Sequence, residues 1–235
     1  MSDERKLIIA IDGPAGSGKS TIAQHMARKL GYVNLETGAM YRALGLKALE
    51  SGVPLDDEGK LYELAQRSTI ALDPTPLGNR VLLDGRDVSQ RIRDADVSDA
   101  ASRVSVHPKV REWMVSHQRE MGKQGGVIME GRDIGTKVFP DADVKIFLDA
   151  KIDVRAQRRV TQVSANDDPS RAKQIAEQMA QRDRRDSTRS ESPLVPAEDA
   201  IIVDSSHLTI EEVIQRIEEI VERRLGRSST GNGRH

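Results

Sequence analysis

The feature that most constrains this chain is the segment GPAGSGKS at positions 13–20. It lies between an apolar run at 7–12 and an amphipathic run that begins at Thr21. The spacing G-x-x-x-x-G-K-[ST] between a strand and a helix is that of a phosphate-binding loop (P-loop). Its glycines let successive backbone N–H groups point at phosphate oxygens, and the following helix adds the positive end of its dipole. A plain glycine-rich turn would need neither the lysine nor both flanks, so the segment predicts a site for a nucleoside triphosphate.

Two side chains of the P-loop carry chemistry of their own. Lys19 can reach the β- and γ-phosphates, and the hydroxyl of Ser20 can ligate Mg²⁺, which is therefore the expected cofactor. The candidate triphosphate-binding residues of the loop are Gly13, Pro14, Ala15, Gly16, Ser17, Gly18, Lys19, Ser20 and Thr21.

Composition argues against several other classes of protein. The 235 residues suffice for one α/β domain, and 36 basic against 37 acidic side chains give a net charge of −1, which attracts neither nucleic acid nor a membrane surface. Three Tyr, two Phe and one Trp are too few for the stacking platforms of single-strand binders. The absence of cysteine excludes disulfides and thiolate metal sites, and no signal peptide or membrane span is evident. We expect a cytoplasmic monomer whose partners are small molecules.

Apolar periodicity predicts strands that alternate with helices. Apolar runs suited to buried parallel strands lie at 7–12, 32–35, 127–129, 144–148 and 200–203. Helical patterns extend from the P-loop to about 30, follow Thr37, cover 58–66, 108–121 and 171–185, and begin at Asp153 and after Thr209. Thr37 can cap its helix, and Thr209 with Glu212 resembles a capping box. The pattern predicts an α/β fold, a three-layer α/β/α sandwich around a five-stranded parallel sheet.

The pattern of apolar and turn-forming residues changes between about 56 and 99. Three short β-like pieces near 69–72, 80–83 and 86–88 are separated by turn residues, so they must pair antiparallel. A βαβ crossover contains no such sheet. We therefore predict an inserted subdomain with a small antiparallel sheet.

One sequence motif occurs twice in the chain. LDGRDV at 83–88 closely echoes MEGRDI at 129–134. The first copy lies between short antiparallel strands, where Asp-Gly is a hairpin turn. The second follows a buried parallel strand, whose carboxyl end is where α/β sheets bind ligands. We assign function only to the second copy.

The arginines indicate which phosphoryl chemistry the P-loop serves. The Asn-Lys-x-Asp guanine reader of GTPases is absent, and no strand ends in the Asp-Glu of motor ATPases. A kinase of small anionic acceptors needs clustered cations, because its catalysis is mostly positioning and charge neutralisation. Arg182, Asp186 and Arg189 fall on one face if their segment is helical. Such a run is more often a solvated face, but the P-loop favours a functional interpretation.

Taken together, these segments resemble the bacterial cytidylate kinases, a family of nucleoside monophosphate kinases. The segments that carry the resemblance, which extends over about 7–225, are 13–21, 36–42, 131–141, 145–150 and 182–189, with 193–197 and 203–206. The resemblance implies transfer of the ATP γ-phosphate to CMP or dCMP. It also implies a single kinase domain at 1–225 with a core at 1–36, 103–154 and 172–225, a monophosphate-binding insert at 37–102 and a short lid at 155–171. The polar residues at 226–235 are expected to form a disordered tail.

Carried over to this sequence, the resemblance implies a role for each member of a set of residues. The acceptor phosphate would lie near Arg42, Arg132 and Arg182. The residues around the nucleoside would be Ser102, Arg111, Asp133 and Arg189 at the cytosine, Arg182 and Asp186 at the sugar, and Thr37 and Tyr41 along the pocket. On the ATP side, Arg158 would lie against the adenine, and Arg155 and Arg159 would face the phosphates. The catalytic set would be Lys19, Arg132, Asp133 and Arg182.

Some points stay open at the level of sequence. Ser20 and Thr21 stand where many members have Gly-Thr, which places an extra hydroxyl at the Mg²⁺ position. Asp12 and Asp133 are both candidates to orient the ion through water. A kinase that prefers UMP or AMP is an alternative, as is a regulatory protein that binds ATP without turnover. Such a binder would have little need for acceptor-side arginines.

Overall fold

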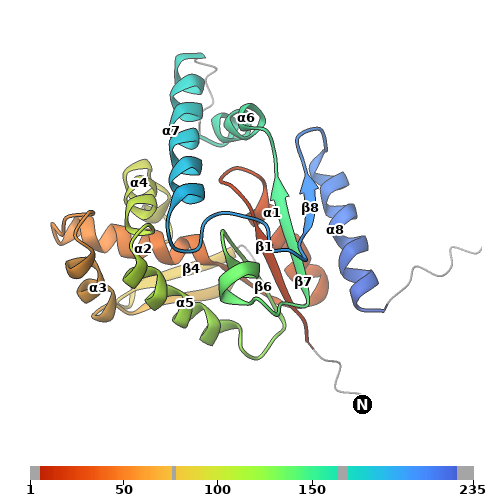
Figure 1. The fold of residues 1–235 in the computed structure, drawn as a ribbon, viewed down its shortest axis with the longest axis horizontal. Coiled ribbons are helices and arrows are strands. Elements are labelled where there is room, and N and C mark those ends of the chain that lie inside the picture. The colour runs from red at the N-terminus through yellow and green to blue at the C-terminus, as the bar shows by residue number, and fades with distance from the viewer. Residues whose placement is uncertain (1–5, 76–77, 164–168, 227–235) are drawn as a thin grey trace, which may run out of the picture.

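A computed structural model describes residues 6–75, 78–163 and 169–226. Five parallel strands form the main sheet, in the order β2-β6-β1-β7-β8 (Figure 1). Their bounds are β1 Ile8–Asp12, β2 Val33–Glu36, β6 Val127–Gly131, β7 Val144–Asp149 and β8 Ile201–Asp204. β1 pairs with β6 on one side and β7 on the other, so the P-loop leaves the middle of the sheet.

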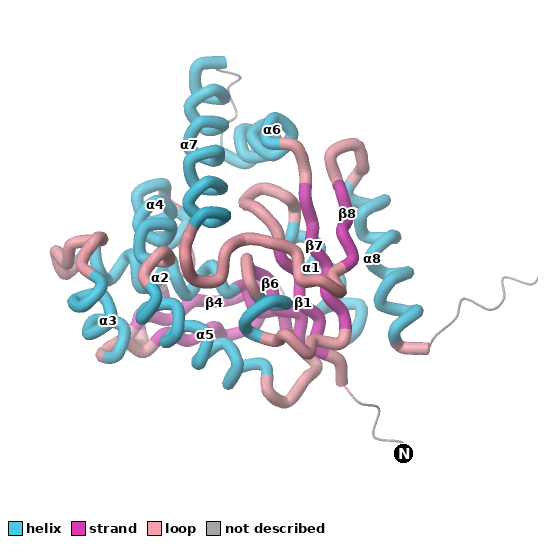
Figure 2. The backbone as a smooth tube through the Cα atoms, viewed as in Figure 1, coloured by secondary structure: helices cyan, strands magenta, loops and turns pink. Residues whose placement is uncertain are grey.

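Helices cover both faces of the main sheet, as Figure 2 shows. Ile9 and Ile11 face α1 (Lys19–Leu30) and α8 (Ile210–Arg224), whereas Ala10 faces the layer of α5 (Pro108–Gly122) and the π-helical turn η2 (Ile134–Val138). This alternation along β1 is that of a strand buried on both sides. The expected three-layer sandwich with a five-stranded parallel sheet is confirmed.

A second, antiparallel sheet lies in the predicted insert. It comprises β3 (Ile70–Thr75), β4 (Gly78–Leu83) and β5 (Arg86–Asp87), which pair in that order. Asp84 and Gly85 have φ values of 51° and 81°, as a tight hairpin between β4 and β5 requires. The first copy of the repeated motif is therefore a structural turn, and its Arg86 is exposed and paired with Glu50.

Four further helical segments share a hydrophobic core with the small sheet. They are α2 (Thr37–Glu50), α3 (Glu58–Gln66), the 3₁₀ turn η1 (Arg91–Arg93) and α4 (Ala95–Val104). The sequence did not predict α4, although its buried Val97, Ala101 and Val104 follow the i, i+4, i+7 pattern. A Cβ on Gly45 of α2 would come 2.9 Å from the backbone nitrogen of Ala101, so the two helices pack backbone to backbone.

Two helices, α6 (Ile152–Val163) and α7 (Pro169–Thr188), stand side by side beyond the carboxyl ends of β1 and β7 (Figure 1). Residues 164–168 of the expected lid and 227–235 of the expected tail lie outside the described residues. The capping box of α8 is confirmed, with Thr209 and Glu212 hydrogen-bonded to each other's backbone. Among the described residues, no helix is long and apolar enough to cross a membrane.

Candidate active site

The P-loop connects β1 to α1 and rests on the end of β7. Gly13, Gly16 and Gly18 all have positive φ, which side-chain-bearing residues rarely adopt. A Cβ on Gly13 would lie 2.0 Å from the carbonyl oxygen of Leu148, so a glycine is obligatory there. The glycines of the motif are thus explained by backbone geometry, and they place the loop at the carboxyl edge where α/β sheets bind ligands.

Lys19, in the first turn of α1, is a buried cation. Its Nζ donates to the carbonyl oxygen of Pro14 at 2.7 Å and to Ser17 Oγ at 3.4 Å. Burial, together with the nearby cations of Arg132 and Arg182, lowers its pKa to about 7. Since these arginines come from the second motif and from α7, the two halves of the site predicted from the sequence meet at Lys19. A bound polyphosphate would add negative charge beside this group of cations.

The two carboxylates that the sequence left as alternatives are both engaged. Asp12 accepts hydrogen bonds from the backbone nitrogens of Ile134 at 2.8 Å and Gly135 at 2.7 Å, and so fixes the start of η2. Burial raises the pKa of Asp12 to about 6 despite these bonds. Asp133 forms a buried ion pair with Arg111, with 2.6 Å between Oδ2 and Nη2.

Glu130 is the carboxylate that sequence reasoning missed. It is buried near the end of β6, opposite Ile11 of β1, and its Oε1 has no hydrogen-bond partner among the described residues. The Glu130 carboxylate is also hydrogen-bonded to the side chain of Ser20. Burial and the nearby Glu36 carboxylate raise its pKa to about 7. The sequence could have indicated Glu130 through its place near the carboxyl end of a buried parallel strand, β6, which lies beside the strand that leads into the P-loop.

The acidic and basic residues near the end of α7 form a buried network. Arg132 Nε lies 2.9 Å from Asp186 Oδ2, and Arg189 Nη1 lies 3.8 Å from Asp186 Oδ1. Burial opposes ionisation of Asp186, but Arg132, Arg182 and Arg189 hold its pKa below the ordinary value. Burial and the charge of Arg132 lower the pKa of the half-buried Arg182 to about 10. The alternative of a solvated charged face is wrong for these residues.

Several polar atoms around this network lack partners in the described part of the chain. They are Tyr41 Oη, Arg42 Nε, Ser102 Oγ, Arg111 Nε, Arg182 Nε and Arg189 Nη2. The guanidinium of Arg111 also lies 5.4 Å above the ring of Tyr41. Buried polar groups in native proteins are nearly always hydrogen-bonded, so such a concentration indicates a ligand site.

Thr37 does not cap α2, contrary to the sequence prediction. Glu36 is the N-cap residue, and its side chain pairs with Arg42 instead of capping the helix. The buried hydroxyl of Thr37 donates to the carbonyl oxygen of Glu130 at 2.7 Å. The bond ties the start of α2 to β6, which brings Tyr41 and Arg42 to the carboxyl edge of the main sheet.

Comparison with known proteins decides the family. A model of the family described as cytidylate kinase matches residues 9–223. The chain belongs to the cytidylate kinase family. A cytidylate kinase of Geobacillus kaustophilus is 49% identical over 223 residues, covering 95% of this chain and 100% of the relative. Another, of Solibacter usitatus, is 48% identical over 233 residues and covers 98% and 97%. The resemblance drawn from the motifs is confirmed, and the function is that of a cytidylate kinase.

Solved structures give a more distant likeness. A shikimate kinase from Bacteroides thetaiotaomicron is 13% identical, with a TM-score of 0.47 over 92% of this chain and 98% of that one. A likeness at this level supports no argument about the substrate.

In this cytidylate kinase, two of the three arginines expected on the ATP side contact the P-loop. Arg155 Nη1 donates to the carbonyl oxygen of Ala15 at 3.1 Å. Arg158 Nη1 lies 3.4 Å from that of Ser17, and Arg158 also donates to the backbone of Ser205 at 2.7 Å. Arg159 is exposed on the same helix. The geometry thus distinguishes Arg155 and Arg158, which are already placed on the loop, from Arg159.

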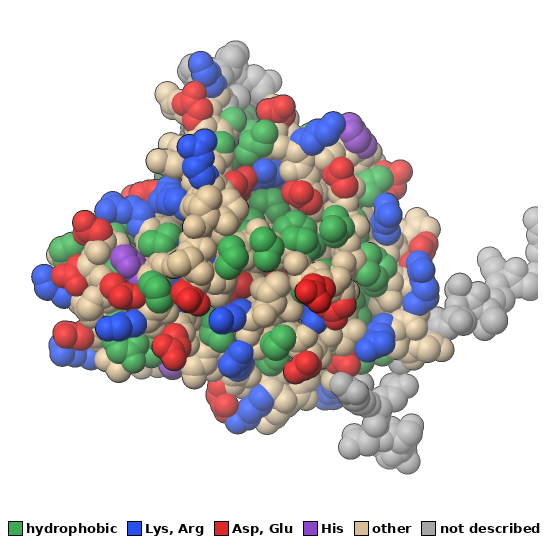
Figure 3. Space-filling view, viewed as in Figure 1, with side chains coloured by type: hydrophobic (Ala, Val, Ile, Leu, Met, Phe, Trp, Pro, Cys, Tyr) green, Lys and Arg blue, Asp and Glu red, His purple; other side chains and the backbone are tan. Residues whose placement is uncertain are grey.

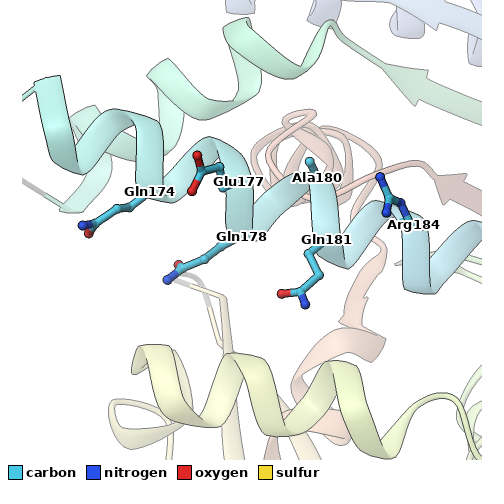
Figure 4. A pocket seen from close by; sticks show the side chains of 6 residues that line it. All are labelled: Gln174, Glu177, Gln178, Ala180, Gln181 and Arg184. Atoms are coloured by element: carbon cyan, nitrogen blue, oxygen red, sulfur yellow. The ribbon is translucent and has the colours of Figure 1, made fainter.

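An open groove of about 510 Å³ runs along α7 on the side of α4. Its lining residues are Gln174, Glu177, Gln178, Ala180, Gln181 and Arg184 (Figure 4). Acidic and basic side chains are interspersed over the face of the molecule shown in Figure 3. All of these lining residues lie on α7, and none of them belongs to the buried network of Arg132, Asp186 and Arg189.

Proposed function

We propose that this cytidylate kinase transfers the γ-phosphate of ATP to CMP or dCMP, with Mg²⁺, to give ADP and CDP or dCDP. The observation that carries the proposal is the position of the buried Lys19 near Arg132 and Arg182, where burial and then their charges depress its pKa. A single phosphate chain needs no second set of cations beside the P-loop. Two chains that meet end to end do, because the charges of donor and acceptor must be neutralised together.

On the donor side, we assign ATP to the P-loop and α6. The residues proposed to bind it are Gly13, Pro14, Ala15, Gly16, Ser17, Gly18, Lys19, Ser20 and Thr21, with Arg155, Arg158 and Arg159. The loop supplies backbone N–H groups and the N-terminus of α1. Arg155 and Arg158 are supported by their contacts with the loop, whereas Arg159 rests on the family resemblance.

On the acceptor side, we assign the phosphate of CMP to Arg42, Arg132 and Arg182. The proposed nucleoside contacts are Ser102, Arg111, Asp133 and Arg189 at the cytosine, Arg182 and Asp186 at the sugar, and Thr37 and Tyr41 along the pocket. Cytosine offers an N4 donor beside N3 and O2 acceptors, and a joined carboxylate and guanidinium such as Asp133 and Arg111 is complementary to that pattern.

Mg²⁺ fits the residues that are present. It prefers oxygen ligands, and Ser20 offers a hydroxyl while Glu130 offers a buried carboxylate oxygen without a partner in the described chain. Asp12 and Asp133 fit less well, since both are already engaged. We therefore propose that Ser20 and Glu130 hold the ion. When bound, Mg²⁺ neutralises phosphate charge and aligns the phosphates.

The chemistry proposed for the chain itself is direct transfer without a covalent intermediate. Lys19 donates to the transferred phosphoryl group, and Arg132 and Arg182 stabilise the charge that develops between donor and acceptor. Asp133 keeps the cytidine base in place through its pair with Arg111. Closure of α6 and α7 over the site would exclude water, which would otherwise accept the phosphoryl group.

The order of the elements along the chain supports separate segments for acceptor binding and for the catalytic core. We propose that the part at 37–102 binds the acceptor, because α2 and α4 carry Thr37, Tyr41 and Ser102. The core would be 1–36, 103–154 and 172–225, and the lid 155–171. We propose a monomer that works in the cytoplasm.

Glu130→Gln is expected to raise the Mg²⁺ concentration for half-maximal activity by about tenfold, a typical effect of losing a metal-supporting carboxylate. The change keeps the volume of the side chain and removes its charge. Binding of Mn²⁺ in the presence of ATP, followed by electron paramagnetic resonance, should weaken in parallel. The control is Glu63→Gln, an exposed position on α3. Unaltered metal affinity in Glu130→Gln would exclude Glu130 from the metal site.

Base selectivity is tested by ADP release with CMP, dCMP, UMP, AMP and GMP as acceptors. We expect CMP and dCMP to be used best. Uracil reverses two of the three features that the site reads, and unpaired buried groups reject a wrong base by up to roughly 10⁴–10⁵-fold. Faster turnover of UMP or AMP would contradict the acceptor assignment, and no turnover at all would favour a non-catalytic ATP binder.

A further inference from the structure

Asp183 is a half-buried acidic residue of α7 that has no role in the reaction proposed above. It directly follows Arg182 of the acceptor set, yet its side chain contacts α6. Its Oδ2 lies 2.7 Å from Nη1 of Arg155, and the two side chains are only 22% and 7% exposed. Its other oxygen, Oδ1, is buried without a partner in the described chain. Removing a carboxylate oxygen from water without a hydrogen-bond partner costs free energy, so the ion pair with Arg155 must offset that cost or serve a function.

The partner of Asp183 is fixed on the P-loop by further bonds. Arg155 Nε donates to the carbonyl oxygen of Ala150 at 2.7 Å, and Nη1 donates to that of Ala15 at 3.1 Å. Because the guanidinium group is planar, these bonds and the ion pair together fix its orientation. The carbonyl oxygens are neutral, so Asp183 supplies the negative charge that keeps the cation in place.

Close packing leaves this part of the P-loop little freedom. A Cβ on Gly16 would lie 3.2 Å from Cβ of Arg155 and 2.9 Å from Cε of Met179 on α7. The loop, α6 and α7 thus meet at one point, and a groove lined by Pro14, Arg155, Asp183 and Arg184 opens beside it. Arg155, although largely buried, contributes to the lining of this groove.

We propose that Asp183 is a positioning residue for ATP: it holds the Arg155 guanidinium against the P-loop, from the helix that also carries the acceptor-side Arg182. The inference rests on the proposed function, in which Arg155 binds the triphosphate. Without the carboxylate, the guanidinium keeps only neutral acceptors and is free to leave the loop. An ion pair that merely joined α6 to α7 would instead affect stability and leave ATP affinity independent of Asp183.

The test is a double-mutant cycle of Asp183→Asn and Arg155→Ala, with the affinities for a non-hydrolysable ATP analogue with Mg²⁺ and for CMP measured by calorimetry. Asp183→Asn is expected to weaken binding of the ATP analogue about tenfold, as for loss of a charge-assisted hydrogen bond, and CMP binding less than twofold. The double variant should bind the analogue no more weakly than Arg155→Ala alone. The control is Asp99→Asn, which removes an exposed carboxylate paired with Arg185 of α7 and should change neither affinity.

Each other outcome overturns the inference. Positioning through Arg155 would be excluded if Asp183→Asn bound the ATP analogue with wild-type affinity. It would also be excluded if that variant lost CMP affinity as strongly as affinity for the analogue, or if the two substitutions had additive effects in the cycle. If Arg155→Ala itself binds the analogue normally, the assignment of Arg155 to ATP fails as well. Loss in Arg155→Ala without loss in Asp183→Asn overturns the role of Asp183 alone.

Discussion

Lys19→Met is expected to lower turnover by about 10²–10³-fold, the usual cost of removing one preorganised donor to a developing charge. The Lys19 Nζ rests on the carbonyl oxygen of Pro14, in the curl of the P-loop, and is already desolvated. A bound phosphate therefore meets a cation that needs no further reorganisation. Methionine keeps most of the apolar stem and removes only the charge, so the packing of α1 should survive.

Stability provides the internal control for this variant. Burial lowers the Lys19 pKa from 10.5 to about 7, so the folded state disfavours the protonated amine. The cost is absent above pH 10.5, grows as the pH falls and is complete below about pH 7. Lys19→Met should consequently melt at the same temperature as the wild type or higher, with the largest gain at and below neutral pH.

Steady-state kinetics and thermal melts at several pH values check both expectations. Lys29→Met is the matched control, because Lys29 lies on the same helix but is exposed and pairs with Glu218. It should keep wild-type turnover. An unchanged rate in Lys19→Met would exclude the P-loop from the reaction.

Arg189→Ala is expected to weaken CMP binding by about 100-fold or more, while affinity for an ATP analogue changes by less than about threefold. Arg189 is buried, donates to the carbonyl oxygen of Ser192 at 2.6 Å and leaves Nη2 without a partner in the described chain. That nitrogen is available to a bound nucleotide. Asp186 retains its 2.9 Å contact with Arg132, so the network should not collapse.

Calorimetric titrations with CMP and with the ATP analogue separate the two sides of the site. The control is Arg185→Ala on the same helix, whose guanidinium pairs with the exposed Asp99. It should leave both affinities near those of the wild type. Equal losses of CMP and ATP affinity in Arg189→Ala would contradict its place on the acceptor side.

The features that the sequence predicted correctly are those with local causes. The P-loop, the buried strand before it and the capping box of α8 each depend on residues within a few positions of one another. The hairpin at Asp84 and Gly85 likewise follows from turn chemistry, which is why the two copies of the repeated motif could be told apart.

The features that the sequence left undecided depend on contacts between distant residues. Asp133 meets Arg111 across 22 positions, and Arg132 meets Asp186 across 54, so spacing alone could not pair them. The position of Thr37 predicted a helix cap, but its hydroxyl instead donates a hydrogen bond to the carbonyl oxygen of Glu130 in β6. The sequence did not identify Glu130 as a site residue because its role depends on burial beside Ser20. Local periodicity does not show whether a single acidic residue is buried.

In the proposed reaction, one site holds two nucleotides and passes phosphate directly between them. Phosphorus NMR of an equimolar mixture of ATP, CMP and Mg²⁺ with the enzyme tests this transfer. We expect CDP and ADP to appear in equal amounts, with the former γ-phosphate at the β-position of CDP and inorganic phosphate at background. Release of inorganic phosphate without CDP would contradict direct transfer between the two nucleotides.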